Sequence, residues 1–125
     1  MKHNKATFNE LYGFSVYGDS NTLKKNVATS NEYDGFYVYG NTNRLQQNKA
    51  KENEGDGFSV KGNSNALKGN KATGNIDTGF VINDTSTGNT VKKNKAAENG
   101  LADYLVNCMA TTFVKNKGND PCSIG

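Results

Sequence analysis

The 125-residue chain contains no tryptophan, one proline, one histidine and one arginine, and it has no long run of apolar residues. A membrane-spanning helix needs about twenty consecutive apolar residues, so the sequence predicts no such helix. The N-terminal stretch MKHNKATFN also lacks the apolar core of a signal peptide. A single arginine and a net charge of only +3 argue against a nucleic-acid-binding surface. We therefore expect neither a membrane nor a nucleic-acid partner.

Hydrophobic residues are also few, at 34%, whereas the chain has 14 glycines and many asparagines. Such a composition is common in disordered chains, which cannot bury enough apolar surface to fold. The residues recur at fixed distances along the chain, however, and strict periodicity is typical of a folded repeat protein. Because no stretch resembles an interdomain linker, we expect one domain.

The period of the repeat is 22 residues, with one interval of 24. It is defined by a column of asparagines: Asn4, Asn26, Asn48, Asn70, Asn94 and Asn116. The same register aligns three apolar columns, which are Phe14, Phe36, Phe58, Phe80 and Tyr104; Val16, Val38, Val60, Ile82 and Val106; and Leu23, Leu45, Leu67, Val91 and Phe113. The two extra residues fall in NDTSTGN, 83 to 89, where we expect a turn to absorb them.

Each unit is predicted to form strands rather than helices. Apolar residues at spacings of three and four are absent, and this excludes the known helical repeats. Short runs such as FYVY, 36 to 39, alternate instead, and Gly, Asn and Asp turn residues separate them. We predict three short strands per unit and one coil of a parallel β-helix per unit. Phe36 and Val38 then point inward, and each asparagine column forms a ladder of side-chain hydrogen bonds.

A known family carries this pattern. The unit G-F-x-V-x-G-x-S-N-x-L-x-x-N-x-A-x-x-N, as in GFSVYGDSNTLKKNVATSN and GFSVKGNSNALKGNKATGN, resembles the right-handed parallel β-helix repeat of pectate-lyase-like and NosD-like proteins. The resemblance covers the chain from Asn4 to about Asn116 and implies an all-β, right-handed parallel β-helix of about five to six coils. It does not specify a function, because this fold hosts lyases, hydrolases, epimerases, adhesins and phage tailspikes.

The two ends of the chain depart from the repeat. The stretch NKATFN reads as the third strand of a coil without its first two strands, so we expect a longer rod upstream or an end that packs against another chain. Residues 108–125 are expected to form an irregular C-terminal cap on a β-helix of residues 1–107. Cys108 and Cys122 could form a disulfide there, which would indicate an extracellular or cell-surface location. Two free thiols are the alternative.

Outward positions of the first strand vary between coils, and binding residues are expected there. Tyr17, Tyr37, Tyr39 and Lys61 occupy two outward columns on adjacent coils. Tyrosine offers a ring face on which a sugar can stack and a hydroxyl that can bond its rim, so these residues are candidates for binding a polysaccharide or glycan. The alternative is that the rings only stabilise exposed strand positions by packing across strands.

The turn beside this face is acidic, and the opposite turn is basic. Stacked carboxylates repel, so they need a neutralising partner or a raised pKa. A Ca²⁺ ion could be that partner, and its candidate ligands are Glu32, Asp34, Glu54 and Asp56. Solvated carboxylates are the alternative, and we expect no other cofactor. The lysines flanking the main asparagine column either follow an anionic polysaccharide or keep the rod soluble: Lys5, Lys24, Lys25, Lys49, Lys68, Lys71, Lys92, Lys93, Lys95 and Lys117.

Catalytic groups are scarce. The resemblance implies an arginine or lysine base with calcium in a lyase, or aspartates on the first strand in a hydrolase. Arg44 and His3 lie away from the tyrosine face, so the base of a lyase is not matched there. No carboxylate occupies the outward columns of that face, so the aspartates of a hydrolase are not matched either. His3 alone also cannot support the copper role implied by the NosD resemblance. We expect a non-catalytic segment that binds carbohydrate or has a structural surface role. The alternatives are the C-terminal part of a polysaccharide lyase, hydrolase or epimerase, and a module that self-associates end to end.

Overall fold

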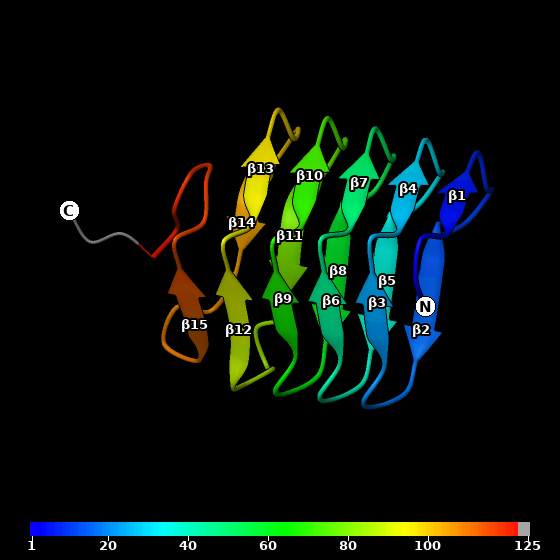
Figure 1. The fold of residues 1–125 in the computed structure, drawn as a ribbon. Coiled ribbons are helices and arrows are strands. Elements are labelled where there is room, and N and C mark those ends of the chain that lie inside the picture. Colours follow the sequence, from blue (N-terminus) through cyan, green and yellow to red (C-terminus); the bar gives the residue numbers. More distant parts are fainter. Residues whose placement is uncertain (123–125) are drawn as a thin grey trace.

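The computed structural model describes residues 1–122 as a stack of β-coils, shown in Figure 1 from the blue N-terminal coil to the red C-terminal segment. Over these residues, fifteen strands form three parallel sheets of five strands each, and no helix is present. The described part of the chain accordingly offers no helix with the length and apolar character to span a membrane. The predictions of an all-β solenoid and of three strands per coil are confirmed.

Each coil contributes one strand to each sheet. The first sheet contains β2 (Phe14–Tyr17), β5 (Phe36–Tyr39), β8 (Phe58–Lys61), β11 (Thr78–Ile82) and β14 (Ala102–Leu105). The second sheet contains β3 (Thr22–Lys24), β6 (Arg44–Gln46), β9 (Ala66–Lys68), β12 (Asn89–Lys92) and β15 (Thr111–Val114). The third sheet contains β1 (Lys5–Thr7), β4 (Val27–Thr29), β7 (Lys49–Lys51), β10 (Lys71–Thr73) and β13 (Lys95–Ala97).

The strand register confirms the sequence repeat. Phe36 pairs with Phe14 on one side and with Phe58 on the other, so residues 22 apart lie directly above one another. The interval becomes 24 between β9 and β12, where Ala66 pairs with Thr90. The two extra residues therefore lie between Ile82 and Asn89, and the parallel pairing continues unchanged beyond them.

Stacked columns of apolar side chains fill the core. The phenylalanine column is buried, and its rings lie nearly parallel, with centroids 4.9, 4.6 and 4.8 Å apart from Phe14 to Phe80. This distance matches the spacing of hydrogen-bonded strands, so one phenylalanine per coil is enough to form a continuous stack. A narrow core of this kind explains how a chain with 34% hydrophobic residues can fold.

Tyr104 ends this stack. Its ring lies 5.2 Å from that of Phe80 and contacts Phe113 edge-on at 4.9 Å. The Tyr104 hydroxyl donates a hydrogen bond of 2.7 Å to the carbonyl oxygen of Lys117.

The C-terminal segment is more regular than we expected. We expected an irregular cap from residue 108, yet β15 still pairs with β12 and an isolated bridge joins Lys95 to Lys117. The coil pairing therefore extends into the segment that we had assigned to the cap.

Buried asparagines carry the pairing through the turns. Asn48 is typical of the main ladder: its Oδ1 accepts from the backbone N–H and the Nδ2 of Asn26, at 2.9 and 3.1 Å. Its own Nδ2 donates to the carbonyl of Leu23 at 2.8 Å and to Oδ1 of Asn70 at 3.0 Å. One side chain thus bonds the coils on both sides and satisfies its own polar atoms, which confirms the structural role predicted for these columns.

Replacing one buried rung should destabilise the rod strongly. In Asn48→Leu, four hydrogen bonds disappear and buried partners on both neighbouring coils are left unpaired, so we expect a loss of about 4 kcal/mol in the free energy of unfolding. Asn41→Ala, at an exposed turn position where the side chain accepts one bond from Asn63, should cost about 1 kcal/mol or less. Urea unfolding followed by circular dichroism measures both values, and equal losses would contradict the assigned role of the ladder.

Candidate functional site

The outward face of the first sheet carries the predicted tyrosines. Phe36 and Val38 of β5 are fully buried, whereas Tyr39 is 45% exposed and Tyr17, its partner on β2, is 70% exposed. Strict alternation along a strand places these rings on the solvent side. Their position therefore follows directly from the repeat register.

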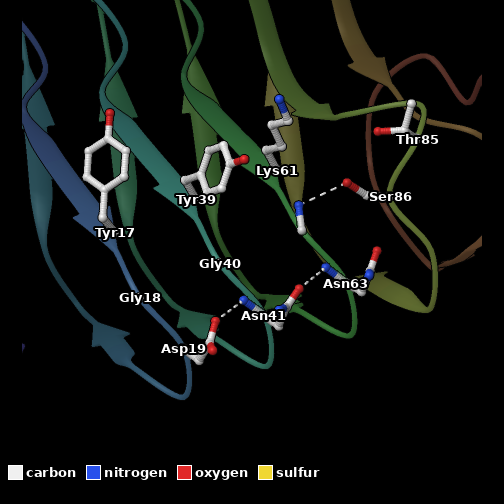
Figure 2. A pocket seen from close by; sticks show the side chains of 11 residues that line it. Tyr17, Gly18, Asp19, Tyr39, Gly40, Asn41, Lys61, Asn63, Thr85 and Ser86 are labelled. Atoms are coloured by element: carbon white, nitrogen blue, oxygen red, sulfur yellow. Dashed lines mark hydrogen bonds between the residues drawn. The ribbon is translucent and has the colours of Figure 1, made fainter.

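Tyr17, Tyr39 and Lys61 line one groove of about 490 Å³ at the turn between the first and second sheets (Figure 2). The two tyrosine rings lie 6.0 Å apart at an interplanar angle of 23°, which forms a short aromatic platform along the rod axis. Lys61 continues the column in the next coil, and its Nζ lies 5.1 Å from the centre of the Tyr39 ring. A cation at this distance interacts favourably with the ring face.

Glycines form the floor of the groove. Gly18, Gly40 and Gly62 follow the three strands at equivalent positions. A Cβ atom on Gly40 would collide with the carbonyl oxygen of Gly18, and one on Gly62 would collide with that of Gly40. Close stacking therefore requires glycine here, and the backbone at the foot of the tyrosines stays uncovered by side chains.

A second, exposed ladder forms the polar edge of the groove. Asp19 Oδ1 accepts from the backbone N–H of Asn41 at 2.7 Å, and Asn41 Oδ1 accepts from that of Asn63 at 2.8 Å. Asn63 Oδ1 accepts in turn from the N–H of Thr87 at 2.9 Å. Each of these bonds uses one side-chain oxygen, so the other Asp19 oxygen and the two amide NH₂ groups remain available to a ligand. The recurrence of Asp or Asn at this position was the sequence signal for this ladder, and we missed it.

The two-residue insertion closes one end of the groove. Thr85 and Ser86 line it, and the Ser86 Oγ accepts a hydrogen bond of 2.9 Å from the N–H of Gly62. Thr85 donates through its hydroxyl to Oδ1 of Asn83 at 2.7 Å, which fixes the loop. On its far side, Asn83 and Asp84 line a different hollow together with apolar residues of β11 and β14. The insertion therefore divides the outward face of the first sheet into two parts.

Tyr37 lies outside this groove. Its ring stacks on Tyr12 at 4.8 Å and lies 5.8 Å from Tyr17, so it supports the platform from the side. Burial, reinforced by neighbouring Tyr17 and Tyr39, raises the pKa of the Tyr37 hydroxyl above its usual range. Of the four predicted binding residues, the structure thus brings three together in the groove and places the fourth against them.

The aspartates of the acidic turn form a ladder of their own. Asp34 Oδ1 accepts from the N–H of Asp56 at 2.7 Å, and Asp56 Oδ1 accepts from the N–H of Thr78 at 2.9 Å. Burial raises the pKa of Asp34 to about 6, with Asp56 and Asp77 adding repulsion while the hydrogen bond from Asp56 lowers it. We had attributed a raised pKa to repulsion between carboxylates, but burial contributes more.

Glu32 and Glu54 lie apart from that ladder. They line a shallow hollow on the same turn together with Glu10 and Glu52. Across residues 1–122, no group of three or more acidic, histidine or cysteine side chains is placed to hold a metal ion. The calcium site stays a prediction.

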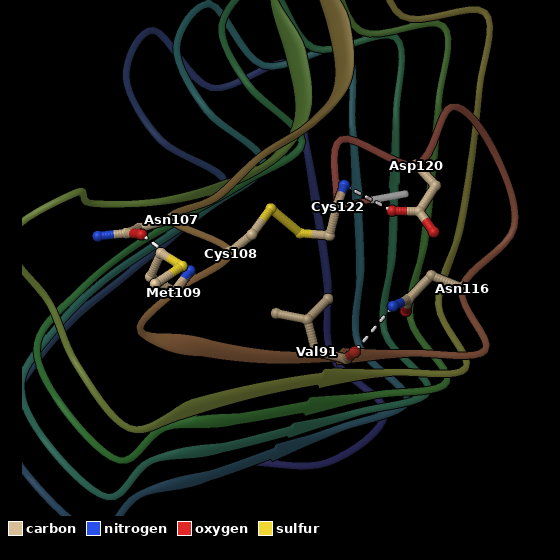
Figure 3. Close-up of a disulfide and its surroundings, with 7 residues drawn as sticks. All are labelled: Val91, Asn107, Cys108, Met109, Asn116, Asp120 and Cys122. Carbon is tan, nitrogen blue, oxygen red and sulfur yellow. Dashed lines mark hydrogen bonds between the residues drawn. A yellow bond between two sulfur atoms is a disulfide. The ribbon is translucent and has the colours of Figure 1, made fainter. Parts of the chain in front are cut away.

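Cys108 and Cys122 are joined by a disulfide, with Cα atoms 5.4 Å apart (Figure 3). Cys108 follows β14, and Cys122 belongs to the segment after β15, where its N–H donates to Oδ1 of Asp120 at 2.7 Å. In the same region Asn116 Nδ2 donates to the carbonyl of Val91 at 2.8 Å, so the main ladder continues beside the bridge. The disulfide ties the last described segment to the end of the first sheet.

Comparison with known families agrees with this architecture. The family model for the right handed beta helix region matches residues 1–122. The chain belongs to this family. Neither curated proteins nor solved structures show a significant match to it.

The raised pKa of Asp34 predicts that this β-helix is more stable at mildly acidic pH. The folded state holds the proton more tightly than the unfolded chain, so the contribution of Asp34 is complete below about pH 4 and is lost as the pH rises through about 6. Asp34→Asn keeps the oxygen that accepts from Asp56 and removes the charge. We expect Asp34→Asn to stabilise the protein by about 1 kcal/mol at pH 7 and to have little effect at pH 4. The value at pH 7 is smaller than the full shift in the pKa of Asp34 implies, because the carboxylate is partly solvated.

The matched variant is Asp34→Ala, which removes both the charge and the acceptor for the Asp56 N–H. It should be less stable than Asp34→Asn at both pH values, because that N–H loses its partner. Thermal unfolding of the three proteins at pH 4 and pH 7 measures these differences. An Asp34→Asn variant with the same stability change at both pH values would contradict the assignment.

Proposed function

We propose that this β-helix is a non-catalytic carbohydrate-binding module and that its ligand lies in the groove of Tyr17, Tyr39 and Lys61. The observation that carries the proposal is the platform of two exposed, nearly parallel tyrosine rings beside a row of polar side chains with unused hydrogen-bonding atoms. Sugar rings present an apolar face and a polar rim, and this combination matches both features of the groove.

The contacts that such a ligand would make follow from the groove. A pyranose ring stacks on the Tyr17 and Tyr39 platform, which is repeated at the spacing of adjacent coils. Its hydroxyl groups bond the Asp19 carboxylate and the side-chain amides of Asn41 and Asn63 along the adjacent edge. Lys61 adds a positive charge at the next coil and favours an oxygen-rich or acidic substituent there.

The groove geometry also favours a short glycan segment. A chain that follows the tyrosines along the rod axis meets the loop of Thr85 and Ser86, which is held by hydrogen bonds to Gly62 and Asn83. Beyond that loop the outward column of Tyr37 and Ser59 continues with apolar Val81 and Leu105, and no tyrosine follows Lys61 in the platform column. We infer that the ligand occupies the coils before the insertion and ends at it.

Binding fits this groove better than hydrolysis does. Glycoside hydrolysis takes a pair of carboxyl groups that flank the scissile bond. Among the described residues that line the groove, Asp19 alone carries a carboxylate, and one of its oxygens accepts the Asn41 N–H.

The disulfide supports an extracellular or cell-surface location, since such bonds persist in oxidising compartments.

Removing either tyrosine of the platform should weaken glycan binding without unfolding the rod. Isothermal titration with pectin, alginate and xylan oligosaccharides identifies a ligand for the wild-type protein. Tyr17→Ala and Tyr39→Ala should then each weaken binding about tenfold, because each removes one stacking surface. Tyr33→Ala is the control, since Tyr33 is 49% exposed and lies outside the groove. Unchanged binding in both groove variants, an equal loss in the control, or a wild-type protein that binds no glycan would refute the proposal.

A further inference from the structure

A different edge of the rod, at the turn between the second and third sheets, is strongly basic. The lysines of the central coils at this edge are Lys24, Lys25, Lys49, Lys68, Lys71, Lys92, Lys93 and Lys95, and Lys2, Lys5, Lys115 and Lys117 occupy equivalent positions at the two ends of the rod. Within residues 1–122, the one ion pair joins Lys51 to Glu52, and neither residue belongs to this edge. Residues 1–122 therefore provide no ion-pair partner for these lysines.

Stacking places the positive charges at regular intervals. Lys49 pairs with Lys71, and Lys71 pairs with Lys95, in the register of the third sheet. Hydrogen-bonded strands lie about 4.8 Å apart, and two like charges at such a distance repel by roughly 1 kcal/mol in water. A linear polyanion lying along the axis would neutralise several of these charges at once.

The basic edge also contains a specific hollow, which we call the Gly69 notch. It measures about 330 Å³ and is lined by Lys24, Gln46, Gln47, Lys68, Gly69 and Lys93. Each coil has a left-handed residue at this turn, and the φ values are 56° for Lys25, 54° for Gln47, 70° for Gly69 and 55° for Lys93. Since lysine and glutamine adopt this conformation in neighbouring coils, the backbone does not require glycine at residue 69. The missing side chain is what opens the notch.

The groups around the notch suit an anion. Lys24, Lys68 and Lys93 each bring an ammonium group from a different coil, and Gln46 and Gln47 bring side-chain amides that can donate hydrogen bonds. We propose that the Gly69 notch is an anion-binding site that holds a sulfate or carboxylate group of a linear anionic polysaccharide lying along the basic edge. This site is separate from the tyrosine groove and does not depend on the function proposed for it.

The same surface fits a nucleic acid poorly. Proteins that hold single-stranded nucleic acids combine a basic groove with aromatic side chains on which the bases stack, and none of the residues lining the notch is aromatic. Arginine is also preferred where phosphate is bound with two parallel hydrogen bonds, and lysine supplies the charge here. A sugar chain with acidic substituents needs only ammonium and amide donors of the kind present.

The decisive variant is Gly69→Gln, which fills the notch with the side chain found at the same position of the preceding coil and leaves the net charge unchanged. A Cβ atom at residue 69 would lie 3.6 Å from Cγ of Gln47, an ordinary contact. We expect binding of a sulfated dextran oligosaccharide, followed by fluorescence titration at about 0.1 M salt, to weaken about tenfold while thermal unfolding stays close to that of the wild type.

Gly74→Gln is the matched control. Gly74 has a φ of 66°, and an added Cβ would lie 3.5 Å from Cγ of Glu52, so the substitution imposes a similar backbone demand on a different turn. It should leave binding of the sulfated dextran unchanged. Lys68→Gln should weaken binding and reduce its dependence on salt, whereas Lys51→Gln, outside the notch, should affect neither.

Three further ligands test the chemical class. A carboxylated polysaccharide of similar charge density should bind with an affinity comparable to that of the sulfated dextran, and neutral dextran should not bind. Single-stranded DNA of matched length and charge should bind at least tenfold more weakly, and equal or tighter DNA binding would overturn the assignment to polysaccharide. The notch itself would be refuted if Gly69→Gln bound sulfated dextran as well as the wild type, or if the wild type did not bind it.

Discussion

The hydrogen-bonded stacking of coils is the constraint on which the rest of this structure depends. Parallel pairing between strands would lapse at each turn, and the buried asparagines prevent this by bonding the coils above and below through one side chain. Because the pairing never shifts, each core position meets its own equivalent in the next coil. The phenylalanine rings therefore stack at the strand spacing, and a core one side chain wide is stable enough to hold the rod together.

The same constraint decides where function can be placed. A residue that recurs in every coil is explained by the stack, whereas a residue that breaks a column is free to serve another purpose. Stacking also brings like charges together: it places Asp34 beside Asp56 in a partly buried turn, and it aligns lysines along the basic edge. The tyrosine platform, the inserted loop at Ser86 and the missing side chain at residue 69 are the deviations that create hollows on an otherwise regular surface.

Sequence reasoning could predict the fold nearly completely, because columns of identical residues encode register directly. It also predicted that Tyr17, Tyr39 and Lys61 share one face, since alternation along a strand fixes which side chains point outward. It could not place Tyr37 against Tyr12, because ring packing between a strand and a preceding turn depends on side-chain rotamers that periodicity does not report. The exposed ladder from Asp19 did leave a signal, the recurring Asp or Asn at this turn position, but these residues are common in turns for other reasons and the signal was missed.

The positions of the two hollows on the coil have a physical consequence for their ligands. The groove lies before the strands of the second sheet and the notch lies after them, and a strand such as β6 is three residues long, or about 10 Å. Because the coils are translated copies, ligands bound as proposed at the two sites would both run parallel to the rod axis. The separation of the sites is close to the Debye length at about 0.1 M salt, so salt would screen much of the effect of a polyanion in the notch on the electrostatic potential at Lys61. Binding at one site would then leave the other open, and coupling between the two proposed sites should be strongest when the groove ligand is acidic and the salt concentration is low.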